Sequence, residues 1–93
     1  MADDVFEWDG KKARANLTKH GVSFEMAREA FKDPVAYEWF GGHERAEDRF
    51  NILGMVNDRV LFVVYTLRND TTRIISARPA ESHEKRLYHE GQY

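Results

Sequence analysis

The stretch RFNILGMVNDRVLFVVYTLRNDTTRIISAR, residues 49–78, decides the fold of this 93-residue chain. It predicts three consecutive strands, because β-branched and aromatic residues fill three runs that the turn pairs Asn57-Asp58 and Asn69-Asp70 separate. The middle run, residues 60–65, is apolar at every position, which indicates a strand covered on both faces. We therefore expect this run at the centre of the sheet.

A short strand at residues 5–8 and a helix at residues 10–20 are predicted at the start of the chain. Asp9 suits the N-cap of this helix, and Gly21 suits the left-handed position that ends one. The few apolar residues of the helix mark its expected buried side: Ala13 and Leu17, helped by Ala15 or His20.

A second helix is predicted from its N-cap Ser23 to the residues before Pro34, which cannot continue it. Apolar side chains at spacings of three and four share one face of this helix: Phe24, Ala27, Ala30 and Phe31. The two helices form a hairpin that turns at Gly21.

The polar segment 41–48 is expected to be the most mobile loop, after one further strand at residues 35–40. Pro79 suits the first turn of a last helix, residues 80–90, which docks through few apolar residues: Ala80, Leu87 and Tyr88. The order β-α-α-β-β-β-β-α predicts an α+β fold, a small antiparallel sheet with helices packed against it.

Composition narrows the class of protein. We expect one domain, residues 1–93, and the absence of cysteine excludes a disulfide scaffold, a thiolate zinc site and a cysteine nucleophile. No leader pattern and no apolar run of about 18 residues is present, so a cytoplasmic protein without membrane contact is expected. The net charge of -2 argues against coating nucleic acid, although segments 11–19 and 68–78 are locally cationic.

The remaining polar residues suit one chemistry. The four histidines lack metal-site spacing and Gly41-Gly42 lacks the context of a phosphate loop, so no metal or other cofactor is expected. RNA cleavage needs neither, because the 2'-hydroxyl is the nucleophile and the protein supplies a base, an acid and cations. The candidates that could move protons are His20, Glu47 and Tyr88, and those that could hold phosphate are Lys19, Arg49, Arg68 and Arg78.

Each candidate also has an ordinary structural explanation. Lys19 and His20 could interact with the dipole at the C-terminus of their helix, and Glu47 and Arg49 could form a surface ion pair. Arg68 could be a solvated turn residue, and Arg78 could cap the end of the sheet against the last helix, near Tyr88. The functional hypothesis therefore depends on whether these side chains gather in one place.

Several short motifs follow one another over residues 6–88: Phe6-x-Trp8-Asp9, Lys12, Asn16, Lys19-His20-Gly21-Val22-Ser23-Phe24, Ala27, Phe31-x-Asp33-Pro34, Glu47-x-Arg49, Gly54, Arg73-Ile74-Ile75-Ser76-Ala77-Arg78 and Glu84-x-x-x-Tyr88. With them the chain resembles the BrnT toxins of the BrnT/BrnA type II toxin-antitoxin modules. The resemblance implies a RelE-like ribonuclease fold and a metal-independent endoribonuclease that arrests translation.

The resemblance also implies a partner. This is the BrnA antitoxin, whose ribbon-helix-helix domain binds operator DNA so that the complex represses its own transcription. Recurrent polar positions of the family are matched by Lys19, His20, Glu47, Arg49, Arg78 and Tyr88, and Arg68 matches the arginine that ends the long central strand. One departure is His43-Glu44, where the family often has His-Ser before the Glu-x-Arg unit.

The resulting hypothesis places an RNA-cleaving site on the sheet face between the end of the first helix and the arginines. The assigned roles are a base for His20 or Glu47, phosphate binding for Arg49, Arg68 and Arg78, positioning of the RNA backbone for Lys19, and base stacking or proton donation for Tyr88. Two other classes stay open: a non-enzymatic interaction module and a domain that binds operator DNA.

Overall fold

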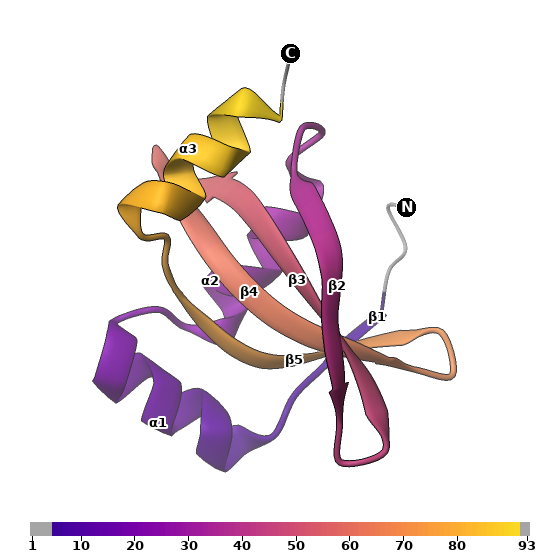
Figure 1. The fold of residues 1–93 in the computed structure, drawn as a ribbon. Helices are drawn as coiled ribbons and strands as arrows, with labels where there is room; N and C mark the ends of the chain where they lie inside the picture. The colour runs from indigo at the N-terminus through magenta and orange to yellow at the C-terminus, as the bar shows by residue number, and fades with distance from the viewer. Residues whose placement is uncertain (1–4, 92–93) are drawn as a thin grey trace.

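The computed structural model describes residues 5–91. Residues 1–4, which belong to the N-terminal segment without a leader pattern, and residues 92–93 lie outside the described residues. Along the chain (Figure 1) lie β1 (Val5–Glu7), α1 (Gly10–His20), α2 (Phe24–Glu29), the 3-10 turn η1 (Ala30–Lys32), β2 (Tyr37–Glu44), β3 (Glu47–Val56), β4 (Arg59–Arg68), β5 (Thr71–Pro79) and α3 (Ser82–Glu90). This order confirms the predicted α+β class, while the RelE-like label stays a prediction.

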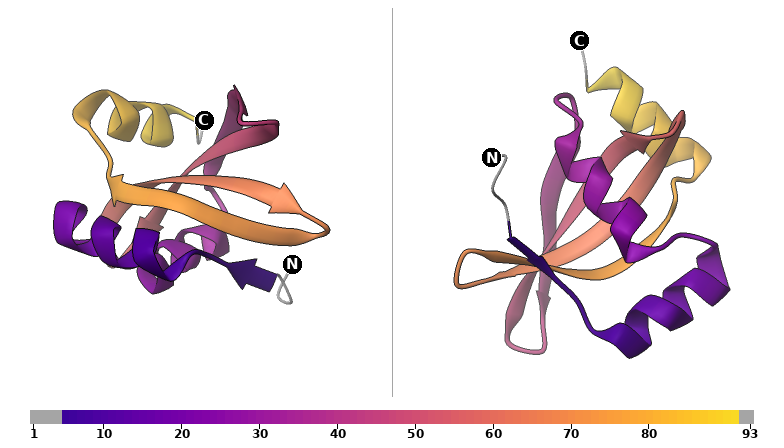
Figure 2. Two further views of the ribbon diagram at one scale, coloured as in Figure 1. Left: turned by 90° about the horizontal axis from the view of Figure 1, so that it is seen from below. Right: turned by 180° about the vertical axis from the view of Figure 1, so that it is seen from behind.

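One five-stranded sheet, in the order β1-β5-β4-β3-β2, forms the middle layer. Strands β2 to β5 are antiparallel, and β1 adds to the edge of β5 as a parallel strand, which makes the sheet mixed. β4 is the central strand, as predicted, and residues from both of its faces, Leu61 and Val60, are buried. α1 and α2 lie on one side of the sheet and α3 on the other (Figure 2).

Tight turns join the four antiparallel strands. Asn57-Asp58 and Asn69-Asp70 form the predicted turns, and all of these residues have positive φ, which asparagine and aspartate tolerate well. Arg45-Ala46 forms a third turn, also with positive φ at both residues. The predicted mobile loop at residues 41–48 is therefore wrong, because β2 and β3 stay paired to the Glu44–Glu47 pair, with a bulge near Gly41.

The predicted caps of the first two helices are confirmed. The Asp9 carboxylate accepts the backbone N–H of Lys12 at 2.9 Å, and Gly21 closes α1 in the left-handed conformation, with φ of 71°. The Ser23 hydroxyl accepts the backbone N–H of Met26 at 3.0 Å. The predicted apolar face of the second helix is buried, and Phe24 is fully covered.

The buried side of α1 differs from the prediction, because Leu17 is 50% exposed and Asn16 is buried instead. The Asn16 amide donates to the carbonyl oxygen of Ala77 at 2.7 Å and accepts the N–H of the same residue at 3.1 Å. It also donates to the carbonyl oxygen of Val22 at 2.9 Å. β1 ends at the pair Glu7–Arg73, so this amide satisfies the β5 edge where no strand does.

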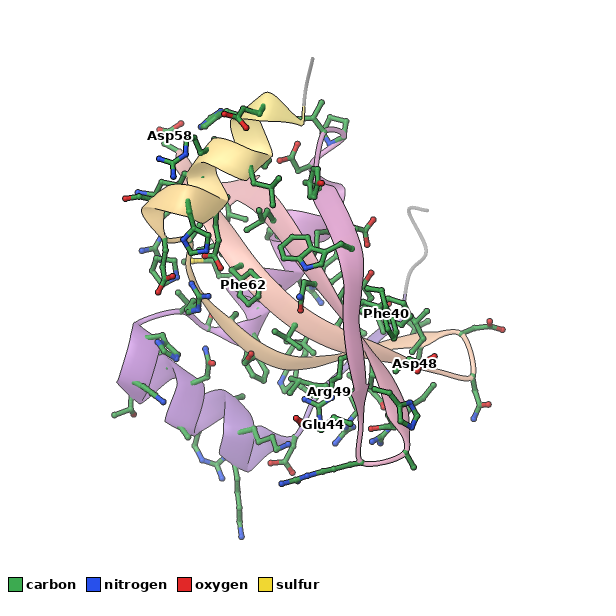
Figure 3. The ribbon with its side chains drawn as sticks, viewed as in Figure 1. Phe40, Glu44, Asp48, Arg49, Asp58 and Phe62 are labelled. Carbon is green, nitrogen blue, oxygen red and sulfur yellow. The ribbon has the colours of Figure 1, made fainter. Side chains whose placement is uncertain are left out.

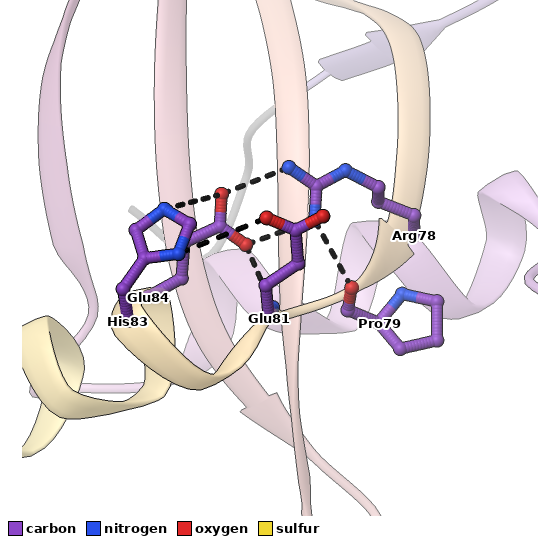
Figure 4. A network of polar contacts seen from close by, with 5 residues as sticks. All are labelled: Arg78, Pro79, Glu81, His83 and Glu84. Carbon is purple, nitrogen blue, oxygen red and sulfur yellow. Dashed lines mark hydrogen bonds and ion pairs between the residues drawn. The ribbon is translucent and has the colours of Figure 1, made fainter.

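α3 is held to the sheet by an arginine–carboxylate pair (Figure 4). Arg78 donates two hydrogen bonds of 2.8 Å to the buried Glu84 carboxylate, which also accepts the N–H of Glu81. Glu81 and Glu84 together form a capping box at the start of the helix. Pro79 ends β5, so its predicted place in the first turn of the helix is wrong.

A second carboxylate ties α3 to the opposite corner of the sheet. Asp33, just after η1, accepts the N–H of Val35 at 3.0 Å, the N–H of Met55 at 2.8 Å and the hydroxyl hydrogen of Tyr88. Burial alone would raise the pKa of Asp33, but these hydrogen bonds outweigh it and lower the pKa. The predicted docking residues Ala80, Leu87 and Tyr88 all pack in the core on this face.

The Asn16 amide gives the first prediction. Asn16→Ala should lower the free energy of unfolding by about 2 to 3 kcal/mol, because buried backbone groups of Ala77 and Val22 lose their partner. Leu17→Ala, next to it on α1 and half exposed, should change it by no more than about 0.5 kcal/mol. Urea denaturation measures both, and equal effects would contradict the role given to Asn16.

The α3 contacts give a pH prediction. Arg78 lowers the pKa of Glu84 despite its burial, so the charged form stabilises the fold above the ordinary carboxyl pKa, and this contribution is lost as the pH falls through the lowered value. In Glu84→Gln, the loss of stability below about pH 4.5 should be smaller than in the wild type. Glu90→Gln, an exposed site on the same helix, should keep the wild-type slope in acid denaturation curves.

Candidate functional site

The face of the sheet opposite α1 and α2 is covered by α3 at one end only. α3 packs there with Leu53, Val60 and Phe62. Side chains alternate along each strand, so residues at steps of two extend this face away from the helix. At the open end all strands contribute charged side chains, here called the charged cluster: Glu7, Glu44, Glu47, Arg49, Arg68 and Arg73.

The arginines of the charged cluster are paired with unequal strength. Arg68 donates two hydrogen bonds to Glu47, at 2.5 and 3.0 Å, and Arg73 donates one to Glu7 at 3.1 Å. Arg49 lies 3.4 Å from Glu44, which is the longest of these contacts (Figure 3). The pairing of Arg49 is therefore the weakest of the three.

The hydrogen bonds from Arg68 lower the pKa of Glu47, and the charges of Arg49 and Arg73 lower it further. The same contact raises the pKa of Arg68. The positive charges of all three arginines therefore act on the Glu47 carboxylate, although the arginines come from three different strands. Glu47 is ionised at neutral pH and can accept a proton.

Arg49 is the least satisfied member of the cluster. Its side chain is only 17% exposed, and its Nε is buried without a hydrogen-bond partner among the described residues. Arg73 pairs with Thr66 on β4. Arg49 precedes Phe50, the partner of Tyr65, so continued antiparallel pairing places Arg49 on the other side of Thr66 from Arg73. A buried N–H donor without an acceptor is costly, so the covered Nε leaves Arg49 less well paired than Arg68 or Arg73.

The predicted site residues separate into groups. Glu47, Arg49 and Arg68 lie in the charged cluster. Arg78 lies on the same face at its other end, where it covers the Phe62 ring at 4.4 Å and binds Glu84. Figure 3 places Phe62 beside α3, and Arg49 with Glu44 towards the β2–β3 hairpin.

The other predicted residues belong to the helices. Tyr88 is 3% exposed, and its hydroxyl donates to Asp33. Lys19, which is exposed, and His20, which is half-buried, end α1. In Figures 1 and 2 this end of α1 lies well apart from the β2–β3 hairpin that carries Glu47. The structure therefore does not bring these three residues to the charged cluster.

Sequence reasoning did not select Arg73 as a site residue. Arg73 and Arg78 are five residues apart, so strict alternation would place them on opposite faces of β5. A bulge changes this, because Ser76 pairs with Val64 while Ile74 pairs with Tyr65, which leaves Ile75 as an extra residue. No sequence signal marks this bulge, and Arg73 is found on the cluster face only in three dimensions.

One group of possible metal ligands occurs within residues 5–91. Ligand atoms of Glu81, His83 and Glu84 lie within 4.8 Å of one another (Figure 4). Glu84 already accepts hydrogen bonds from Arg78 and from the Glu81 N–H, so its carboxylate serves the start of α3. None of the described helices is both long and apolar enough to cross a membrane.

Two comparisons with known proteins bear on this geometry. A family model described as "Ribonuclease toxin, BrnT, of type II toxin-antitoxin system" matches residues 8–84. The match includes the Arg78–Glu84 pair and all of the charged cluster except Glu7, and it ends before Tyr88. No curated protein matches the chain.

Proposed function

Because this chain belongs to the BrnT family of ribonuclease toxins of type II toxin-antitoxin systems, we propose that RNA is cut at its charged cluster. The observation that carries the proposal is Arg49, which is largely buried on an open sheet face with an unpaired Nε. A family of ribonucleases needs a phosphate-binding site, and guanidinium groups bind phosphate in two-point contacts. Arg49 and Arg73 supply such groups on either side of Thr66.

The proposed reaction uses the RNA itself as the nucleophile. The 2'-hydroxyl loses its proton to a base, and its oxygen attacks the adjacent phosphorus. The bond from phosphorus to the 5'-oxygen breaks, and this oxygen takes up a proton from water as it leaves. The products are a 2',3'-cyclic phosphate and a free 5'-hydroxyl, and the step requires no metal ion. Arg49 and Arg73 stabilise the charge that builds up on the phosphorane oxygens.

Glu47 is the base that the geometry favours over His20. It lies on the same strand face as Arg49, two residues away, whereas His20 lies at the end of α1. Arg68 keeps Glu47 ionised and holds it in place through two hydrogen bonds. Arg78 and Tyr88 then act through α3, which they fix on the sheet, and Lys19 remains available for contacts with the RNA backbone.

Members of a type II system act together with an antitoxin. We propose that the partner of this chain is of the BrnA type, with a ribbon-helix-helix domain through which the complex binds operator DNA. In this proposal the free toxin arrests translation in the cytoplasm by cutting RNA, and the antitoxin prevents the cutting.

Cleavage of total RNA by the purified chain in EDTA tests the site. Arg49→Ala should slow cleavage by about 100-fold, because a preorganised donor to the phosphorane is lost. Arg59→Ala removes the same charge at the opposite end of the sheet, where Arg59 contacts Met26, and should cleave like the wild type. A wild-type protein without activity would favour the non-enzymatic interaction module, and full activity of Arg49→Ala would remove the proposed site.

The pH dependence of single-turnover cleavage separates the two candidate bases. Glu47 has a lowered pKa, so its protonation should slow cleavage only below about pH 4.5. A histidine base would lose activity below about pH 6.5. Glu47→Gln should abolish the acid limb together with most of the rate. An acid limb near pH 6.5 that disappears in His20→Gln would assign the base to His20.

A further inference from the structure

A row of uncharged side chains lies between the charged cluster and the residues under α3. Trp39 pairs with Asn51 across β2 and β3, Asn51 pairs with Val64 of β4, and Val64 pairs with Ser76 of β5. All of these residues are half-buried. We propose that this row, here called the neutral row, binds the nucleobase next to the cleaved phosphate. The proposal rests on the function proposed above and names the part of the substrate that the neutral row recognises.

The position of the neutral row fits one nucleotide. Asn51 and Arg49 are two residues apart on β3, so their side chains leave the same face about 7 Å apart. A nucleotide whose phosphate lies between Arg49 and Arg73 would place its base over the next row. α3 and the β2–β3 hairpin stand on the same side of the sheet in Figure 2, and they flank this position.

The chemistry of the neutral row fits a base better than a second phosphate. Its side chains are an indole, an amide, an isopropyl group and a hydroxyl, and none carries a charge. A nucleobase offers a flat apolar face for stacking and a polar edge for hydrogen bonds, and Val64 forms an apolar floor between Asn51 and Ser76. The row on one side carries Arg49 and Arg73. The row on the other side lies under α3 and is apolar except for Arg78, which is paired with Glu84.

Trp39 supplies a rigid aromatic surface. Its ring lies 5.7 Å from the ring of Tyr37 and 5.8 Å from that of Phe62, so two aromatic neighbours fix its orientation. The indole Nε1 lies 3.1 Å from the side-chain oxygen of Asn51, in the amide orientation that satisfies both partners. A fixed ring loses little conformational freedom when a base stacks on it.

Asn51 supplies the polar contact. In the same orientation its amide nitrogen donates to the carbonyl oxygen of Phe50 at 3.3 Å, which leaves one donor and one acceptor position for the edge of a base. The bulge residue Gly41 makes room for this amide, because a Cβ at Gly41 would lie 2.9 Å from it. The absence of a side chain at this bulge residue therefore leaves the space that the Asn51 amide occupies.

Tryptophan fluorescence tests the stacking contact without any cleavage. The probe is a single-stranded 2'-O-methyl RNA oligonucleotide, which lacks the nucleophile. The chain has two tryptophans, and Trp8 packs against Phe24 on the opposite side of the sheet. In Trp8→Phe, saturating oligonucleotide should quench the remaining emission of Trp39, whereas the emission of Trp8 in Trp39→Phe should stay nearly constant. The proposal is overturned if the oligonucleotide quenches only the Trp8 emission of the Trp39→Phe variant, or if the oligonucleotide does not bind.

Base preference tests the hydrogen-bond contact. Cleavable oligonucleotides that differ only at the bases flanking one cut should be cleaved with a preference, and Asn51→Ala should reduce the ratio of best to worst base by about tenfold. Asn51→Asp keeps the shape and removes the donor, so it should shift the preference towards bases that present donors. An unchanged preference in both variants, with cleavage still dependent on Arg49, overturns the neutral row alone. If the wild type does not cleave, the proposed function fails and the fluorescence result decides the base site by itself.

Discussion

The alternation of side chains along β3, β4 and β5 is the constraint on which the site depends. Turns with positive φ at both central residues fix the pairing of these strands, and this geometry matches the right-handed twist of paired strands. A slip by one residue would carry Arg49 and Arg68 to the face that α1 and α2 cover. The bulge at Ile75 adds one exception, and through it Arg73 shares a face with Arg78. The charged cluster is thus a consequence of register.

Sequence patterns predicted the parts of the fold that local chemistry determines. The apolar run of β4, the asparagine–aspartate turns and the caps of α1 and α2 each carry their signal within a few residues. Asn16 has no such signal, because its burial depends on the Ala77 backbone at the edge of β5. The same holds for Arg73, whose face depends on a bulge, and for Glu47, whose partner proved to be Arg68 on the next strand. The sequence alone therefore does not predict contacts between residues that are far apart in the chain.

Charge balance explains how an acidic chain can hold a polyanion. Each arginine of the charged cluster has a glutamate within reach, so the cluster itself is close to neutral before a ligand binds. The glutamate side chains of these pairs are 63%, 27% and 41% exposed, and ion pairs that water reaches contribute little free energy, so a phosphate could replace a glutamate at small cost. Arg49 is the easiest to re-pair, because Glu44 is 3.4 Å away and 63% exposed. Arg68 is the hardest, because two hydrogen bonds join it to Glu47, and this keeps the carboxylate near the reacting group.

The two carboxylate ties of α3 also shape the proposed substrate site. Glu84 neutralises Arg78 and holds it over Phe62, so the guanidinium group of Arg78 is already paired at this end of the face. Among the described arginines on the strands of this face, the more weakly paired one, Arg49, lies at the open end, and the neutral row separates it from α3. A nucleotide bound as proposed would meet the weakly paired arginine on one side only. In the proposed complex this asymmetry would set the direction of the nucleotide, because a reversed nucleotide would place its phosphate beside the paired Arg78 and its base over charged side chains.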